Sequence, residues 1–159
     1  MCVLVDNEPG VLARVIGLFS GRGYNIDSLT VSETEHEKHL SRITIVTRGT
    51  PMVIEQIKNQ LERLVPVHRV IDLTTTSPAI QRELAMVKVR GTGTTRTQSL
   101  AVAEKFDARV IDETGESYVF EITGATDQIE SCISQLLPLG LVEVSRTGVV
   151  AITCGPEGM

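Results

Sequence analysis

One order of elements, strand–helix–strand–strand–helix–strand, is predicted twice along this chain of 159 residues. The first copy consists of short apolar or β-branched runs and stretches with helical apolar spacing, at 2–5 (strand), 11–19 (helix), 26–31 (strand), 40–47 (strand), 53–64 (helix) and 67–73 (strand). The second copy follows at 84–90 (strand), 100–106 (helix), 109–112 (strand), 118–122 (strand), 129–137 (helix) and 142–152 (strand). Ser77-Pro78 marks the break between the copies, followed by a short helical turn to Arg82. The chain is therefore predicted to be α+β, with two units at 1–76 and 77–159.

This βαββαβ order is typical of the ferredoxin-like arrangement, in which two helices cover one face of a four-stranded antiparallel sheet. The other face of the sheet stays bare, and an open β-branched edge favours aggregation unless something covers it. We therefore expect the second unit or another chain to cover the bare face or edge of each sheet, and we expect at least a dimer.

Composition excludes several classes of function. The formal net charge is -5 and aromatic residues make up 3% of the chain, which argues against nucleic acid, because such proteins present a basic face and often stacking platforms. No apolar run approaches the ~20 residues of a membrane span, and the first residues do not resemble a signal peptide. We expect a cytoplasmic protein that binds neither nucleic acid nor membrane.

Few residues form a pattern that would carry chemistry. Cys2, Cys132 and Cys154 are far apart with no CxxC pair, which argues against a disulfide framework. His36 and His39 could hold zinc, but a zinc site needs three or four protein ligands and no other ligand lies nearby in sequence.

His68 has no obvious partner for a catalytic base. The loop Gly91–Arg96 contains glycines, hydroxyls and cations, as phosphate-binding loops do, yet it matches neither GxxxxGK[ST] nor GxGxxG. The sequence thus predicts no catalytic residue and no metal site.

The first strand-to-helix turn, 6–10, is the most informative segment. It places free backbone N–H groups at a helix N-terminus, where a carboxylate is favoured, and Gly10 lets a ligand approach the backbone closely. Asn7 offers a donor and an acceptor, and Asn25 could lie across the same end of the sheet. Two interpretations remain open: these groups grip a zwitterion, or Asn7 caps the helix and Gly10 only packs.

The sequence around this turn resembles a known family. The runs V-D-N-E-P-G-V-L-A-R-V (5–15) and G-L-F-S-G-R-G-Y-N-I-D-S-L-T-V (17–31) resemble the regulatory small subunit of acetolactate synthase, and the first unit resembles an ACT domain. The segments L-S-R-I-T-I-V (40–46) and R-T-G-V-V (146–150) also resemble this family. The similarity covers almost the entire chain.

This resemblance implies a non-catalytic subunit that activates the catalytic large subunit and confers feedback inhibition by valine, in the biosynthesis of valine, leucine and isoleucine. It implies a homodimer through the ACT domains, with valine between the two domains. It also implies that the chain binds no cofactor itself, whereas thiamine diphosphate, Mg²⁺ and FAD are expected on the catalytic subunit. The matching positions for the effector are Asn7, Gly10, Val11 and Leu12 from one protomer, and Asn25 and Ile26 from the other.

Two other functions are compatible with the residues alone. The first is a free-standing ACT-type amino-acid sensor that serves a different enzyme. The second is a small ferredoxin-like enzyme such as an acylphosphatase, for which Gly91–Arg96 is the candidate loop.

Overall fold

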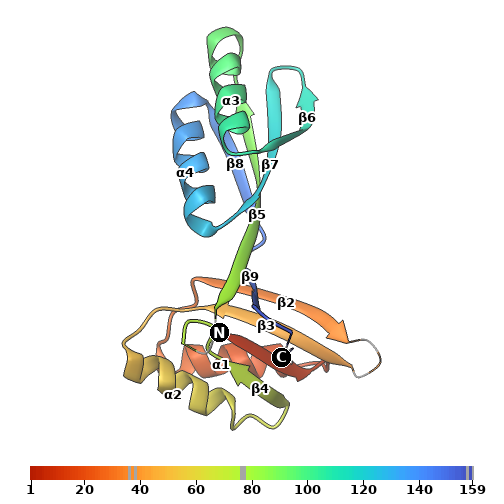
Figure 1. Ribbon diagram of the computed structural model, residues 1–159, viewed down its shortest axis with the longest axis vertical. Coiled ribbons are helices and arrows are strands. Elements are labelled where there is room, and N and C mark those ends of the chain that lie inside the picture. The colour runs from red at the N-terminus through yellow and green to blue at the C-terminus, as the bar shows by residue number, and fades with distance from the viewer. Residues whose placement is uncertain (36, 38, 76–77, 157, 159) are drawn as a thin grey trace. The chain divides into compact units, whose positions relative to one another are not determined.

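The computed structural model describes residues 1–35, 37, 39–75, 78–156 and 158. It confirms the α+β class and both βαββαβ units. The first contains β1 (Cys2–Asp6), α1 (Val11–Arg22), β2 (Ser28–Glu35), β3 (Leu40–Val46), α2 (Pro51–Leu61) and β4 (Val67–Ile71). Its four strands form an antiparallel sheet in the order β2-β3-β1-β4, with β2 and β4 at the edges. Figure 1 shows α1 and α2 on one face of this sheet.

Alternation along the strands builds the first core. Val3 and Val5 of β1 and Ile43 and Ile45 of β3 point to the helix-covered face and are at most 2% exposed. Further core side chains come from the apolar stripes of the two helices, namely Val11, Val15, Phe19, Ile57 and Leu61. The register pairs Val3 with Ile43, so the two strands present their apolar side chains to the same layer.

The second unit repeats this plan. Its elements are β5 (Ala79–Arg90), α3 (Gly93–Lys105), β6 (Arg109–Thr114), β7 (Ser117–Gly124), α4 (Thr126–Leu136), a 3-10 turn at Leu137–Leu139 and β8 (Leu141–Arg146). The sheet order β6-β7-β5-β8 is the same as in the first unit when the strands are numbered within each unit. The core again uses alternate residues, Val87 and Val89 facing Phe120 and Tyr118 on β7 and the helix residues Ile129 and Leu136.

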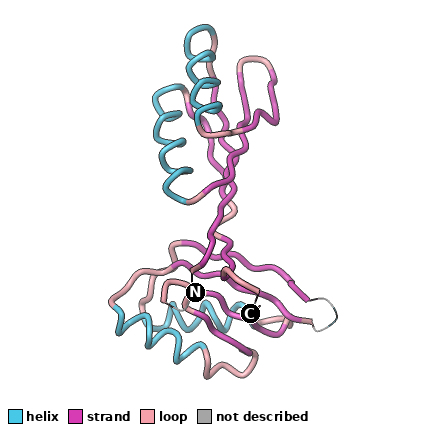
Figure 2. The backbone as a smooth tube through the Cα atoms, viewed as in Figure 1, coloured by secondary structure: helices cyan, strands magenta, loops and turns pink. Residues whose placement is uncertain are grey.

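The division of the chain differs from the expected one at residue 76. The first unit contains Met1–Gln81 together with Val149–Met159, and the second contains Arg82–Gly148. The expected helical turn after Pro78 is wrong, since β5 already begins at Ala79. The last expected strand is interrupted, because β8 ends at Arg146, Gly148 adopts a positive φ of 83°, and a separate β9 (Val150–Thr153) follows. Figure 2 shows this break as loop between two strand segments.

The returning segment covers part of the sheet face that the helices leave bare. Val149 donates its N–H to Ser28 Oγ at 3.0 Å and accepts from Thr30 Oγ1 at 3.1 Å, both on β2. Arg42 of β3 donates to the Ala151 carbonyl at 2.6 Å. In Figure 1, β9 lies on the opposite side of the first sheet from α1 and α2. The expectation that the bare face needs a cover is therefore met in part by the chain's own C-terminal segment.

In the part of the chain that the structure describes, no helix is long and apolar enough to cross a membrane.

Candidate functional site

The first β–α turn has the geometry of an anion-binding helix start. Gly10 is the N-cap of α1, has φ 86°, and no side chain caps the helix. The interpretation in which Asn7 caps this helix is therefore wrong. A Cβ built on Gly10 would meet no atom of the described residues within 4 Å, so the space beside Gly10 is open among them. The first backbone N–H groups of α1 are thus placed where a ligand carboxylate would be stabilised by hydrogen bonds and the helix dipole.

The turn is held in place by neighbouring backbone. The Asp6 N–H donates to the Pro66 carbonyl at 2.9 Å, and the Asn7 N–H donates to the His39 carbonyl at 2.7 Å. Because the backbone of Asn7 is fixed by His39, just before β3, its exposed side chain is presented to solvent from a defined position. Asp6 Oδ1 also lies 2.6 Å from His68 Nε2 of β4, so the turn is connected to both neighbouring strands.

The two apolar residues at the start of α1 have different environments. Val11 is 4% exposed and belongs to the core, whereas Leu12 is 37% exposed. Within one chain, Leu12 can therefore contact a ligand in front of the turn through its side chain. The Val11 side chain is buried away from such a ligand, and the Val11 N–H already donates to the Glu8 carbonyl at 3.3 Å.

Asn25 and Ile26 lie just before β2. Asn25 Nδ2 donates to Asp27 Oδ1 at 2.6 Å, and the Asn25 carbonyl accepts from Thr47 Oγ1 at 2.6 Å. Asp27 in turn pairs with Arg48 Nε at 2.8 Å. Ile26 is partly buried against the first core. The amide of Asn25 is thus oriented by its neighbours and remains exposed.

The structure separates these residues from the turn within one chain, so the expectation that Asn25 lies across the same end of the sheet is wrong. The register pairs Asp6 at the end of β1 with Leu40, whereas Ser28 at the start of β2 pairs with Val46 at the other end of β3. β1 and β2 are both antiparallel to β3 and therefore parallel to each other. The end of one strand and the start of the other consequently lie at opposite ends of the sheet.

The structure adds little support for a metal site at His36 and His39 or for a phosphate site at Gly91–Arg96. His36 lies outside the described residues, and His39 is exposed with φ 51°. Among the residues that are described, no three His, Cys, Asp or Glu side chains are placed to hold a metal ion. The expected loop Gly91–Arg96 is wrong in part, because α3 begins at Gly93. Arg96 lies on this helix, where its guanidinium is paired with Glu113 at 2.7 Å and lies 5.2 Å from the centroid of the Tyr118 ring.

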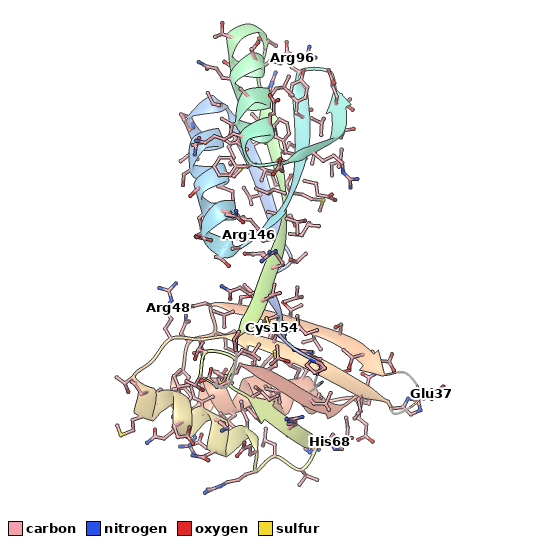
Figure 3. The ribbon with its side chains drawn as sticks, viewed as in Figure 1. Glu37, Arg48, His68, Arg96, Arg146 and Cys154 are labelled. Carbon is pink, nitrogen blue, oxygen red and sulfur yellow. The ribbon has the colours of Figure 1, made fainter. Side chains whose placement is uncertain are left out.

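The buried charges of the second unit were not predicted. Glu83 of β5 is 5% exposed, and its two carboxylate oxygens each accept from Arg146 at 2.8 Å, in a bidentate pair. Arg146 also pairs with Glu130 of α4, and Figure 3 shows Arg146 beside this helix. The hydrogen bonds from Arg146 hold the pKa of Glu83 below its ordinary value, although burial opposes this shift. Nothing in the alternation of β5 distinguishes Glu83 from a solvated strand residue, so sequence reasoning had no signal for this cluster.

Comparison with known proteins identifies the family. Residues 1–69 match the family model described as the AHAS small subunit-like ACT domain, and residues 82–155 match the model described as the small subunit of acetolactate synthase. The acetolactate synthase small subunit of Mycolicibacterium smegmatis is 42% identical over 159 residues, covering 100% of this chain and 92% of the relative. The chain belongs to the acetolactate synthase small subunit family.

Two further relatives agree in sequence and in structure. The acetolactate synthase small subunit of Aquifex aeolicus is 45% identical over 151 residues, covering 94% of this chain and 78% of the relative. The crystal structure of the small subunit from Thermotoga maritima matches with a TM-score of 0.86 at 37% identity, covering 98% of this chain and 96% of that one. Membership of this family thus extends over both units, and the first unit is an ACT domain.

Proposed function

We propose that this chain is the regulatory subunit of an acetolactate synthase, which activates the thiamine-diphosphate-dependent catalytic subunit and confers inhibition by valine. The observation that carries the proposal is the α1 start: an open helix N-terminus without a side-chain cap, preceded by a fixed turn with an exposed Asn7, in a chain of the small subunit family. Backbone N–H groups of this turn take the carboxylate of the amino acid, and the side-chain oxygen of Asn7 takes the ammonium. Leu12 bounds the side of a small branched side chain.

The second half of the effector site comes from another protomer. Asn25 and Ile26 lie at the far end of the sheet from the turn, so one chain cannot bring them to the same ligand. β2 is an edge strand whose Val31 is 41% exposed, and an antiparallel pairing of two β2 edges around a two-fold axis places the start of one β2 beside the end of the other. This pairing brings the turn of one protomer to the end of the sheet where Asn25 and Ile26 of its partner lie.

Inhibition follows from linkage. Valine binds one arrangement of the ACT dimer more tightly than the other, and it shifts the complex towards the less active state by that difference in affinity. The chain takes part without a cofactor of its own, and thiamine diphosphate, Mg²⁺ and FAD stay with the catalytic subunit. Dialysis of the small subunit against chelator before reconstitution is therefore expected to leave activation unchanged.

The proposal is tested by acetolactate formation with the catalytic subunit alone, with this chain, and with this chain plus valine. We expect activation by the chain and inhibition when valine is added. Gly10→Asp places a carboxylate in front of α1, where the ligand's carboxylate is proposed to bind, and is expected to abolish inhibition while activation stays within about twofold.

Gly115→Asp is the matched control. Gly115 also has a positive φ, 63°, and open space around its Cβ position, but it lies in the β6–β7 hairpin. This variant should keep the full response to valine. Full valine sensitivity of Gly10→Asp would refute the site, whereas no effect of the wild-type chain on the synthase would favour a free-standing ACT sensor for a different enzyme.

A further inference from the structure

The C-terminal segment Val149–Thr153, which we call the strap, is held to the first sheet mainly by side chains. Both backbone groups of Val149 are bonded by hydroxyls of β2, from Ser28 and Thr30. Arg42 Nη2 donates to the Ala151 carbonyl at 2.6 Å and also lies 3.3 Å from Cys2 Sγ. The strap also pairs through its backbone with β5. It therefore lies over the sheet face at β2 and β3, where a small number of side-chain bonds attach it to the first sheet.

The strap is only lightly buried. Val149 is 6% exposed, whereas Val150 and Ile152 are 49% and 58% exposed. Segments with few buried apolar contacts and exposed hydrogen bonds open at a lower free energy than the core. A small change in the position of β2 can thus change how often the strap is bound, because two of its bonds depend on β2 hydroxyls.

The residues immediately before the strap are anchored just as firmly, but to the second unit. Arg146 holds the buried Glu83 in a bidentate pair, and the Gly148 N–H donates to the same carboxylate. The Thr147 N–H donates to the Leu84 carbonyl at 3.0 Å, and Thr147 Oγ1 accepts from the Leu84 N–H at 3.1 Å. Gly148, with φ 83°, is therefore the last residue anchored on the second unit, and Val149, the next residue, is the first anchored on the first sheet.

We propose that the strap transmits the effector state of the ACT sheet to the second unit through Gly148. This inference rests on the proposed function and specifies how it is regulated. Asn25 and Ile26 lie just before β2, and Ser28 and Thr30 of β2 bind Val149. A ligand that contacts Asn25 and Ile26 therefore shifts the two β2 hydroxyls that bind the strap. The strap has two states, bound to the sheet or released, and the ligand biases their equilibrium. The covalent chain then passes this bias to the Glu83–Arg146 anchor.

An insertion tests the transmission while preserving both anchors. Gly-Gly-Ser inserted between Gly148 and Val149 leaves every strap bond and every bond of Arg146 and Thr147 possible, but it removes the tight connection between them. The matched control carries the same insertion after Gly115, in the exposed β6–β7 turn. Each full-length variant is combined with the catalytic subunit, and valine binding is measured by calorimetry alongside inhibition of acetolactate formation.

We expect the insertion after Gly148 to leave the Kd for valine within about twofold and to raise the half-inhibitory valine concentration about fivefold or more, the lower end of typical allosteric coupling. The control should match the wild-type chain in both measurements. Equal inhibition in the two insertion variants would overturn the proposal. Loss of valine binding in the Gly148 variant would also overturn it, because the strap would then be part of the binding site and not a transmitter.

Hydrogen exchange gives a readout that does not need the synthase. Arg42→Met removes the donor to Ala151, and we expect faster amide exchange at Val149–Thr153, while Arg42→Lys restores part of the protection. Added valine should change exchange in the same segment of the wild-type chain. If Arg42→Met leaves this exchange unchanged, the strap is not held as proposed. If the wild-type chain does not bind valine, the proposed function fails, and the exchange of the Arg42 variants still reports separately on the strap.

Discussion

The Glu83–Arg146 pair offers a quantitative test of the second unit. Glu83 is 5% exposed and makes two bonds of 2.8 Å to Arg146, which is itself 29% exposed. Removing one partner of a fully buried pair costs about 3–5 kcal/mol, and removing an exposed pair costs about 0–1 kcal/mol. Arg146→Met leaves a buried carboxylate without its main donor, but part of the site stays open to water. We expect this variant to lower the free energy of unfolding of the second unit by about 2 kcal/mol.

A double-mutant cycle separates the pair from its surroundings. Glu83→Gln keeps the shape of the side chain and leaves Arg146 paired with Glu130, so it should cost about 1 kcal/mol. In the double variant with Arg146→Met the buried charge is gone, and the coupling energy should be about 1 kcal/mol or more. Urea unfolding followed by circular dichroism measures all four chains. A coupling below about 0.5 kcal/mol would show that the bidentate geometry does not stabilise the unit.

The same pair predicts a pH dependence with a definite sign. The pKa of Glu83 is lowered in the folded chain, chiefly by the hydrogen bonds from Arg146, from an ordinary value of about 4.5. A carboxyl group whose folded pKa is depressed stabilises the protein above its unfolded pKa and loses this contribution as the pH falls through its folded pKa. The stability difference between the wild type and Glu83→Gln should therefore be constant near neutral pH and shrink below about pH 4.5. A difference that grows on acidification would contradict the assignment.

Three shorter predictions concern packing and thiol reactivity. A Cβ at Gly140, where φ is 92°, would lie 2.2 Å from the Arg90 carbonyl oxygen, so Gly140→Ala should destabilise the second unit by about 2 kcal/mol or more in urea unfolding. The exposed Cys154 should react rapidly with Ellman's reagent, whereas Cys132 should react only on unfolding, because burial shields its thiol and raises its pKa. Phe19→Ala should cost about 3–5 kcal/mol in the first unit, since the ring is 1% exposed, and thermal unfolding would report this loss.

Element types were predictable where local pattern and tertiary packing agree. The second helix is an example: Thr50 caps it through a 3.4 Å bond from the Val53 N–H, and Pro51 occupies its first position, as the sequence indicates. The apolar run at 2–5 and the β-branched run at 40–47 likewise predicted the strands β1 and β3. These signals depend only on neighbours within a few positions in the chain.

Helix starts were less predictable where capping residues compete. Near the start of the fourth helix, Thr126 and Asp127 are residue types that favour the N-cap position, yet the N-cap is Ala125, and Gln128 Oε1 accepts from the Ala125 N–H at 3.1 Å. At α1 the alternative in which Asn7 caps the helix does not occur, and the Asn7 N–H instead donates to the His39 carbonyl. His39 lies just before β3, over thirty positions further along the chain, so this bond leaves no local signal.

The arrangement of the candidate site and the interruption of the last strand could not be predicted without knowledge of the sheet topology. Asn7 and Asn25 both looked like residues at one end of a sheet, but strand direction places them at opposite ends. The apolar run at 142–152 looked like one strand, but Gly148 divides it between two units. In each case the decisive fact is a pairing between distant segments, such as Thr30 with Val149, which periodicity cannot reveal.

The first unit has three features that can accept a further partner: the face of its sheet without helices, the β2 edge and the start of α1. Its bare face is partly covered by the chain itself, through the strap held by Ser28, Thr30 and Arg42. Its β2 edge is suited to pairing with a second copy of the same strand, and no side chain in the described part of the chain caps the N–H groups of the α1 start. A ligand at the proposed site touches the second and third of these features at once, and Ser28 and Thr30 connect β2 to the first. A regulatory role therefore requires no additional element in this fold: the strand that would form the dimer is also the strand that holds the strap.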